Sequence, residues 1–247
     1  TLNKNEKDAA IIDQFAFDTR YIFSCLVDAD SLDTRFFHRY NATQSLCCQG
    51  KVLESRVGNY EAALQKVNNI LNSFSAETEL QKVRSEIQAQ AYESTTTEIN
   101  LLSMPTGSGK TLCSLKLAME NLIKNNKKRI IYIIPYNSII DQTAFIFESI
   151  FGSDVPILRH QSTYAVEDAE EADTKWIYDA IENWDAPFII TTSAQFFESI
   201  YGNKRNKLRR LHNMGDSILV FDEIHKLPDK YLQPCLQSIS YLTKFCN

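Results

Sequence analysis

The chain has 247 residues, 44% of them hydrophobic and 23% charged, a composition typical of a globular protein with one large domain and an appended segment. Its net charge of −5 argues against a protein that coats nucleic acid non-specifically, although a local basic track stays compatible with it. The apolar runs are too short to span a bilayer and the N-terminus lacks the apolar core of a signal peptide, so we expect a cytoplasmic protein. The six cysteines lack the spacing of a zinc site, and we expect them to be reduced thiols.

All six prolines and five of the seven glycines lie after residue 100, which predicts a helical first part and a strand–turn–helix remainder. Residues 8–38 are predicted to form one or two helices, residues 47–59 a connector, and residues 60–74 a helix with one apolar face. The positions of the first helical region that we expect to be buried are Ile11, Ile12, Phe15, Ile22, Leu26 and Phe37. A further helix is expected from Ser75 to about Tyr92.

Five apolar segments follow, and helical patterns separate them. They lie at residues 99–104, 129–135, 155–161, 186–192 and 217–223. Near-continuous apolar strands fit a sheet that is covered on both faces, and the alternation of strands with helices predicts a parallel, doubly wound α/β sheet. Ligands of such sheets bind at the carboxyl ends of the strands, so polar residues at those ends are candidate site residues.

The segment MPTGSGKT, residues 104–111, follows a predicted strand and opens a predicted helix, which is the setting of a phosphate-binding loop. The residues expected to cradle the phosphates are Thr106, Gly107, Ser108, Gly109, Lys110 and Thr111. The two glycines allow a tight turn, the helix N-terminus adds positive charge, Lys110 can reach the β- and γ-phosphates, and the Thr111 hydroxyl can bind Mg²⁺. Met104 stands where the general pattern has its first glycine, and a glycine-rich turn that contains a lysine is the alternative.

The segment ILVFDEIH, residues 218–225, is a buried strand that ends in two carboxylates. Asp222 can hold Mg²⁺ through water, and Glu223 can orient and deprotonate an attacking water. Alone, this segment is also compatible with a solvated turn. Combined with the phosphate loop in one sheet, it predicts a site for Mg²⁺-dependent ATP hydrolysis with Lys110, Asp222 and Glu223 as catalytic residues.

PTGSGKT followed by DEIH resembles motifs I and II of superfamily-two helicases, whose first motif does not require glycine at the position of Met104. This resemblance implies a RecA-like lobe, and it implies that His225 couples the nucleotide state to the nucleic-acid side. Upstream, RSEIQAQA resembles the adenine-recognising Q motif, which implies that Gln88 reads the base edge with support from Arg84. A hydrogen-bonded histidine at a strand end and an exposed helix glutamine are the alternatives.

IIPYNSIIDQTA and ITTSAQFFESI resemble motifs Ia and Ib of the same superfamily. The polar residues at these strand-to-helix junctions, which suit phosphate oxygens, are Tyr136, Asn137, Ser138, Thr191 and Thr192. The basic run at 203–213 follows, and Arg209 and Arg210 are candidates for contact with a nucleic-acid backbone. Helix capping and a solvated charged face are the respective alternatives.

Together with FSCLVDADSLDT at 23–34, the motifs resemble the CRISPR-associated helicase–nuclease of type I systems, in which an HD-type metal nuclease domain precedes two RecA-like lobes. The resemblance implies that residues 1–46 are the C-terminal helices of an incomplete HD domain, 47–75 a connector with a helix and 76–247 the first RecA-like lobe. It also implies that Asp30, and as second choice Asp28, binds a divalent transition metal, but only with ligands that this sequence lacks. Surface carboxylates on a helix are the alternative.

The same resemblance implies an ATP-dependent motor that moves along single-stranded DNA and partners a CRISPR RNA-guided surveillance complex, with no membrane involved. The S-A-T motif, the second lobe and its arginine finger are not in the sequence. We therefore expect the chain to bind Mg-ATP, to hydrolyse it very slowly and not to unwind duplexes. An RNA helicase lobe and a non-catalytic nucleotide-binding module that docks on an effector complex stay open as alternatives.

Overall fold

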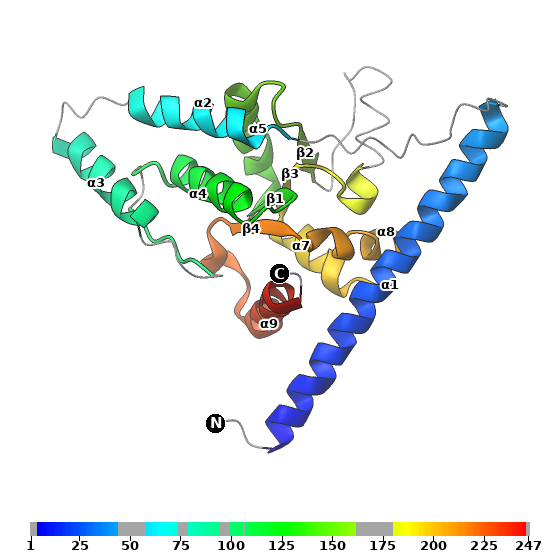
Figure 1. Ribbon diagram of the computed structural model, residues 1–247. Helices are drawn as coiled ribbons and strands as arrows, with labels where there is room; N and C mark the ends of the chain where they lie inside the picture. Colours follow the sequence, from blue (N-terminus) through cyan, green and yellow to red (C-terminus); the bar gives the residue numbers. More distant parts are fainter. Residues whose placement is uncertain are drawn as a thin grey trace.

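The structure is a computed structural model, and it describes residues 4–43, 58–73, 79–93, 99–105, 107–161 and 180–245. The described residues contain an all-parallel sheet with the strand order β2-β3-β1-β4 (Figure 1). Its strands are β1 (Arg129–Ile134), β2 (Ile157–His160), β3 (Phe188–Thr192) and β4 (Ser217–Phe221). Strand β1 therefore lies between β3 and β4, and the predicted parallel α/β architecture is confirmed.

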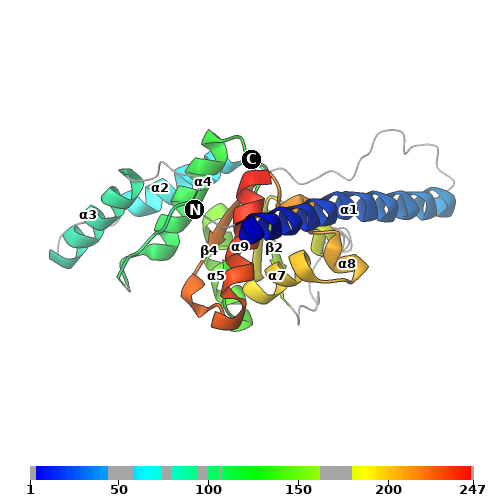
Figure 2. The ribbon, with the colours of Figure 1, turned by 90° about the horizontal axis from the view of Figure 1, so that it is seen from below.

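Helices cover both faces of this sheet. The α-helices are α1 (Lys4–Thr43), α2 (Tyr60–Ser73), α3 (Glu79–Glu93), α4 (Lys110–Lys124), α5 (Asn137–Phe151), α7 (Ser193–Tyr201), α8 (Arg205–Leu208) and α9 (Asp229–Phe245), and η2 (Leu211–Met214) and η3 (Ile224–Lys226) are short 3-10 helices. Helices α2, α4 and α5 lie on one face, while α1, α7 and α9 lie on the other (Figures 1 and 2).

Strand β1 shows how the sequence specifies this layered arrangement. All six of its residues are buried. Ile130, Tyr132 and Ile134 join the core with α2, α4 and α5, whereas Ile131 and Ile133 join the core with α7 and α9. Because successive side chains of a strand point to opposite faces, a continuous apolar run such as RIIYII requires cover on both sides.

The prediction of a strand at 99–104 is wrong. Residues 99–105 form no strand, and Leu101 is 87% exposed. A run of apolar residues provides suitable side chains but no hydrogen-bonding partner, and strand propensity depends on that context.

Helix α2, which the sequence assigned to a connector, packs in the core of the lobe. Its Tyr60, Ala63 and Val67 are buried against α4, α5 and the sheet. The Tyr60 hydroxyl donates a hydrogen bond to the Pro187 carbonyl at 2.6 Å, directly before β3. Among the described residues, α2 is thus packed as part of the lobe, which was predicted to begin only at residue 76.

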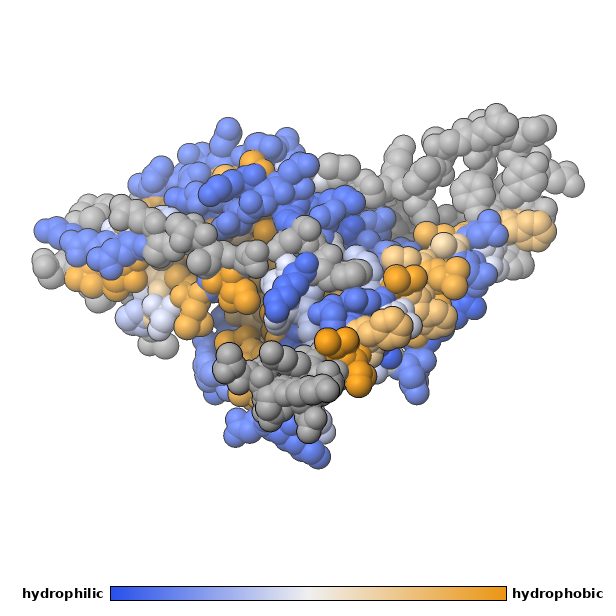
Figure 3. All heavy atoms as spheres, turned by 60° about the horizontal axis from the view of Figure 1, so that its bottom comes forward, coloured by the Kyte–Doolittle hydropathy of each residue, from blue (hydrophilic) through white to orange (hydrophobic). Residues whose placement is uncertain are grey.

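Helix α1 contacts the lobe with the face opposite to the expected one. Phe17 is buried in the core of the lobe, and Ser24 and Asp28 are buried against it. The six apolar residues that were expected to be buried, namely Ile11, Ile12, Phe15, Ile22, Leu26 and Phe37, are 63–72% exposed instead. We call these six residues the α1 apolar stripe, and Figure 3 shows hydrophobic side chains gathered along this helix. The prediction that these six positions are buried is wrong for this structure.

None of the helices within the described ranges is both long enough and apolar enough to cross a membrane.

Candidate functional site

The predicted phosphate-binding loop leads directly into α4. Gly107 and Gly109 have φ angles of 78° and 85°, in the left-handed region where a side chain would be strained. The Ser108 side chain is buried, and its hydroxyl donates to the Pro105 carbonyl at 2.7 Å, which fixes the turn from within. Lys110 is the first residue of α4, so the N–H groups of the first helical turn follow the glycines at once. Such an N-terminus is suited to phosphate oxygens.

The acidic residues lie at the carboxyl end of β4, beside β1. The backbone N–H of Asp222 donates to the Ile133 carbonyl at 2.8 Å, which holds the residue at the edge of the sheet. Glu223 follows with a φ angle of 52°, unusual for a residue with a side chain. Its carboxylate accepts a hydrogen bond from Lys110, with Nζ and Oε1 3.0 Å apart. The structure thus brings together the lysine of one motif and the glutamate of the other.

The two carboxylates differ in their electrostatic surroundings. The hydrogen bond from Lys110 lowers the pKa of Glu223, which keeps this carboxylate ionised. Partial burial, followed by repulsion from Glu223, raises the pKa of Asp222. His225 is 64% exposed, and its Nε2 lies 3.3 Å from Glu223 Oε2. The carboxylate of Asp222 and the hydroxyl of Thr111 are hard oxygen donors, the kind of ligand that suits Mg²⁺.

Helix α3 contacts the loop from the side. Gln88 donates from Nε2 to the Ser108 carbonyl at 2.9 Å, and a Cβ at Gly109 would approach the same nitrogen to 2.7 Å. The sequence missed a second contact, in which Lys116 Nζ of α4 lies 3.8 Å from the centre of the Tyr92 ring of α3. The predicted adenine reader is therefore located at the phosphate loop. The side chain of Arg84 and all of Thr106 lie outside the described residues.

The two predicted nucleic-acid junctions differ in what they expose. Tyr136, Asn137 and Ser138 are exposed at the start of α5, and Tyr136 is 54% exposed. Thr191 is fully buried and donates to the His160 carbonyl at 3.1 Å, while Thr192 accepts from the Gln195 N–H at 3.2 Å as the N-cap of α7. The first junction presents side chains to solvent, whereas the threonine hydroxyls of the second make hydrogen bonds within the protein.

The structure does not support nucleic-acid contact by the side chains of Arg209 and Arg210, which are 4% and 5% exposed. Arg210 donates from Nε to the Ile181 carbonyl at 3.0 Å and lies over the Trp184 ring. Burial lowers its pKa to about 10. Arg209 donates to the carboxylates of Asp28 and Glu182. A charge run usually indicates a solvated face, but here two consecutive arginines point inward.

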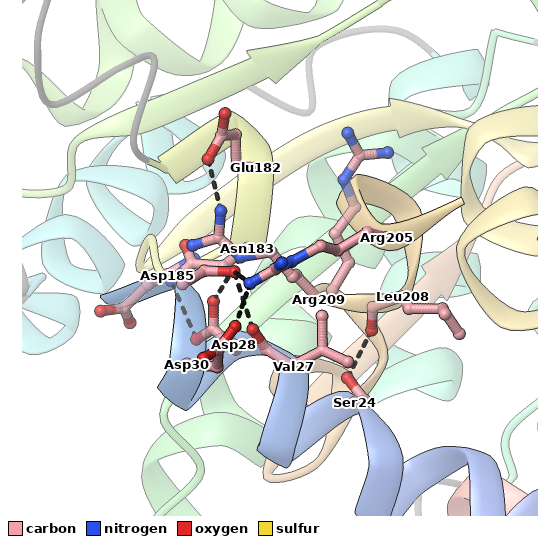
Figure 4. A network of polar contacts seen from close by, with 12 residues as sticks. Ser24, Val27, Asp28, Asp30, Glu182, Asn183, Asp185, Arg205, Leu208 and Arg209 are labelled. Carbon is pink, nitrogen blue, oxygen red and sulfur yellow. Dashed lines mark hydrogen bonds and ion pairs between the residues drawn. The ribbon is translucent and has the colours of Figure 1, made fainter. Parts of the chain in front are cut away.

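The two aspartates considered as metal ligands are engaged by arginines (Figure 4). Asp28 is buried and accepts from Arg209 Nε at 2.7 Å, while the exposed Asp30 pairs with Arg205. No group of three or more potential metal ligands occurs among the described residues. Asp28 therefore does not fit a metal-ligand role here. It belongs instead to a polar network that also includes Glu182 and Arg35, which the sequence analysis missed.

One signal could have identified that network. Asp28 and Arg35 are separated by seven residues, or two helical turns, and both lie opposite to the α1 apolar stripe. Arg35 donates to Glu182, which also accepts from Arg209. A polar pair of opposite charge on the less apolar face of a long helix is a pattern that indicates a specific contact.

Two similarities to known proteins bear on this site. Residues 85–246 match the DEAD/DEAH box helicase family, a region that includes Gln88, the phosphate loop and both acidic residues. Over 168 residues the chain is 28% identical to a protein of Haloferax volcanii named CRISPR-associated nuclease/helicase Cas3. The alignment covers 60% of this chain and 18% of that relative, so the chain spans well under half of the relative's length.

Proposed function

Because this chain belongs to the DEAD/DEAH box helicase family, we propose that it is the ATP-binding first motor lobe of an enzyme that moves along single-stranded DNA. The observation that carries the proposal is the contact between Lys110 and Glu223 at the carboxyl edge of the sheet. These residues come from the two motifs that a helicase uses to bind and hydrolyse ATP. Their proximity makes one nucleotide site out of two distant segments.

The contact itself suggests how the site works. In this structure Lys110 donates to Glu223, and the γ-phosphate of ATP would compete for the same ammonium group. Once Lys110 turns to phosphate, the Glu223 carboxylate is free to orient a water molecule and accept its proton. Thr111 and Asp222 would hold Mg²⁺, which supplies neutralisation of the phosphate charge when bound. Gln88 would read the adenine edge, and Thr106, Gly107, Ser108 and Gly109 would cradle the phosphates.

The proposed path of the nucleic acid runs past the ends of β1 and β3. These strands are neighbours, with Ile134 opposite Thr192, so the N-termini of α5 and α7 open at the same edge of the sheet. Both N-termini suit phosphate oxygens. The exposed Tyr136 ring can stack on a base, while Asn137 and Ser138 can donate to the backbone. His225, exposed and close to Glu223, is the proposed link between nucleotide and strand.

We propose that the complete protein acts in CRISPR interference with an RNA-guided surveillance complex, as the name of the Haloferax relative suggests for that protein. We also propose that α1 is part of a helical nuclease domain, to which residues 1–46 belong. The α1 apolar stripe supports this assignment, because each large apolar side chain gains about 1.5–3 kcal/mol on burial. Among the described residues Asp28 and Asp30 pair with arginines and belong to no group of three potential metal ligands, so the proposed role of α1 does not include metal binding by them.

Binding experiments with the full chain test the motor assignment. A fluorescent ATP analogue with Mg²⁺ should bind, and Lys110→Ala should abolish that binding. Fluorescence anisotropy with single-stranded DNA and RNA of the same sequence, in the presence of a non-hydrolysable ATP analogue, should give tighter binding to DNA. Binding to RNA alone would favour the RNA helicase alternative.

Hydrolysis measurements separate the remaining possibilities. We expect very slow ATP turnover by this chain, and rapid DNA-stimulated turnover would contradict that expectation. In the complete protein, Glu223→Gln should abolish CRISPR interference. Interference that survives Glu223→Gln but not Lys110→Ala would indicate a non-catalytic nucleotide-binding module.

A further inference from the structure

Helix α1 is attached to the lobe at the C-terminal end of α7. Arg20 donates from Nε to the Ile200 carbonyl at 2.8 Å and from Nη2 to the Gly202 carbonyl at 2.5 Å. Carbonyl groups at a helix C-terminus lack partners within the helix and carry partial negative charge. A guanidinium at this position therefore satisfies two acceptors and complements the helix dipole, which ties α1 to the end of α7.

A second set of contacts holds the turn between α8 and β4. The Ser24 hydroxyl donates to the Leu208 carbonyl at 2.5 Å and accepts from the backbone N–H of His212 at 3.0 Å. The Tyr21 hydroxyl donates to the His212 carbonyl at 2.9 Å. A Cβ at Gly215 would clash with the same hydroxyl, so α1 lies directly on the backbone of this turn. Helix α1 thus contacts main-chain groups that no side-chain exchange in the turn would remove.

Asp28 is at the centre of the interface (Figure 4). One carboxylate oxygen accepts from Arg209 Nε at 2.7 Å, and the other accepts from Asn183 Nδ2 at 3.4 Å and lies 3.5 Å from His212 Nε2. Burial lowers the pKa of His212, although Asp28 opposes this effect. The cluster continues on the far side of Arg209, which donates from Nη1 to Glu182. Each carboxylate oxygen of Asp28 is therefore in contact with a specific group of the lobe.

The charge at this position gives orientation more than stability. A buried ion pair contributes little net stability compared with apolar residues of similar volume, because both charges lose their hydration. Removing one partner is costly, however, since the other charge then stays buried and unpaired. An ionic centre between Asp28 and Arg209 therefore penalises a rotated or shifted position of α1 more strongly than an apolar contact would.

The two segments that α1 contacts are connected to the proposed working parts of the motor. Helix α7 begins directly after Thr192, at the proposed nucleic-acid edge, and α1 contacts its other end. The turn that contains His212 leads into β4, whose end carries Asp222 and Glu223. A displacement of either segment would therefore act on α1 through the direct hydrogen bonds between them.

We propose that Asp28 is a positioning residue that fixes α1 on the segment between α7 and β4, so that α1 follows movements of this segment when the lobe binds its ligands. The first part depends only on the contacts described above. The second part, in which α1 responds to ligand-induced movements of this segment, rests on the proposed function. This role is distinct from metal binding, for which the same aspartate was considered.

The chain offers a matched pair of variants. Asp28→Asn removes the buried charge, and Asp30→Asn makes the same change two residues away, where Asp30 forms an exposed pair with Arg205. Hydrogen exchange of the ligand-free full chain, followed by mass spectrometry, compares them. Asp28→Asn should accelerate exchange in residues 11–35 and 205–216 by about tenfold or more, and Asp30→Asn by less than about threefold. Equal effects of the two variants would overturn the positioning role.

Ser24→Ala provides a second variant if Asp28→Asn lowers the yield of folded protein. It removes a buried hydroxyl that contacts Leu208 and His212 but leaves the charges in place. It should accelerate exchange in the same two segments by about threefold to tenfold. Unchanged exchange in α1 of this variant would contradict the proposal, since the same interface would then contribute nothing to its attachment.

A ligand-response experiment tests transmission separately. In the wild-type chain, a non-hydrolysable ATP analogue with Mg²⁺ and an oligo-dT strand should change exchange in both α1 and residues 205–216. Asp28→Asn should bind the analogue within about twofold of wild type, yet its α1 should no longer respond. Analogue binding without any response of wild-type α1 would overturn transmission alone. Failure of the wild-type chain to bind the analogue would overturn the proposed function, and transmission with it.

Discussion

The ion pair between Lys110 and Glu223 predicts that Glu223→Gln separates ATP binding from hydrolysis. The two side chains are 32% and 37% exposed, and Nζ and Oε1 lie 3.0 Å apart. A partly exposed pair of this kind contributes about 0.2–1 kcal/mol, which ATP must replace when its phosphates recruit the lysine. Removal of the carboxylate should therefore strengthen ATP binding by up to about fivefold. Hydrolysis should fall by about 10²–10⁴-fold, because the proposed general base is lost.

Equilibrium titration with a fluorescent ATP analogue and single-turnover hydrolysis measure the two quantities independently. Glu120→Gln is a matched control, because Glu120 pairs with Lys116 on the same helix, α4, with Nζ and Oε1 3.7 Å apart. The control should leave both quantities within about twofold of the wild type. ATP binding that weakens about tenfold in Glu223→Gln would refute the reasoning, since Lys110 would then need the glutamate to keep its position.

Three further predictions concern stability and solubility. Burial lowers the pKa of His160 to about 3 from an ordinary 6.5. As the pH falls, the unfolded chain therefore binds a proton that the folded chain does not. The free energy of unfolding should fall by up to about 1.4 kcal/mol per pH unit below about pH 6.5. Urea unfolding at pH 7 and pH 5 should show a smaller pH dependence for His160→Gln than for the wild type, and an equal dependence would contradict the prediction. Val67→Ala, in the fully buried face of α2, should lower the unfolding free energy of the lobe by about 2 kcal/mol, and a loss below about 0.5 kcal/mol would place α2 outside the core. Phe15→Ser and Ile22→Ser, in the α1 apolar stripe, should reduce self-association in light scattering while the unfolding free energy changes by less than about 0.5 kcal/mol.

The sheet was predictable because its strands are covered on both faces. A strand such as β1 must be apolar at every position, so the run RIIYII is visible in the sequence without knowledge of its neighbours. The same feature does not identify partners. Residues 99–105 are comparably apolar in part, yet they form no strand, so an apolar run alone does not show that a segment pairs with the sheet.

The geometry of the candidate nucleotide site was predictable for a different reason. The residues of each motif are close in sequence, and the local turn sets their geometry, as the left-handed Gly107 and Gly109 show. Lys110 and Glu223 are 113 residues apart, but each lies at the end of an element whose position in a parallel sheet is known in advance. The match to the DEAD/DEAH box helicase family confirms the resemblance that was drawn from these motifs.

The arginine run was misinterpreted because charge alone does not show which way a side chain points. Arg209 and Arg210 lie between the four-residue α8 and a 3-10 helix, where no regular periodicity separates an inner from an outer face. Their acceptors are distant in sequence, since Asp28 lies 181 residues before Arg209. Only the tertiary fold brings such a carboxylate to an arginine.

Helix α1 combines two kinds of contact surface, and their difference suggests a division of roles. Its face toward the lobe buries Phe17 and adds specific polar contacts, because Arg20, Ser24 and Asp28 each contact particular atoms. Its opposite face is the α1 apolar stripe, which favours burial but tolerates sliding, since the hydrophobic effect is not directional. A partner domain that packs on the stripe would therefore gain stability from it, while its orientation relative to the proposed ATP site would be set by α1 and its hydrogen bonds to the lobe.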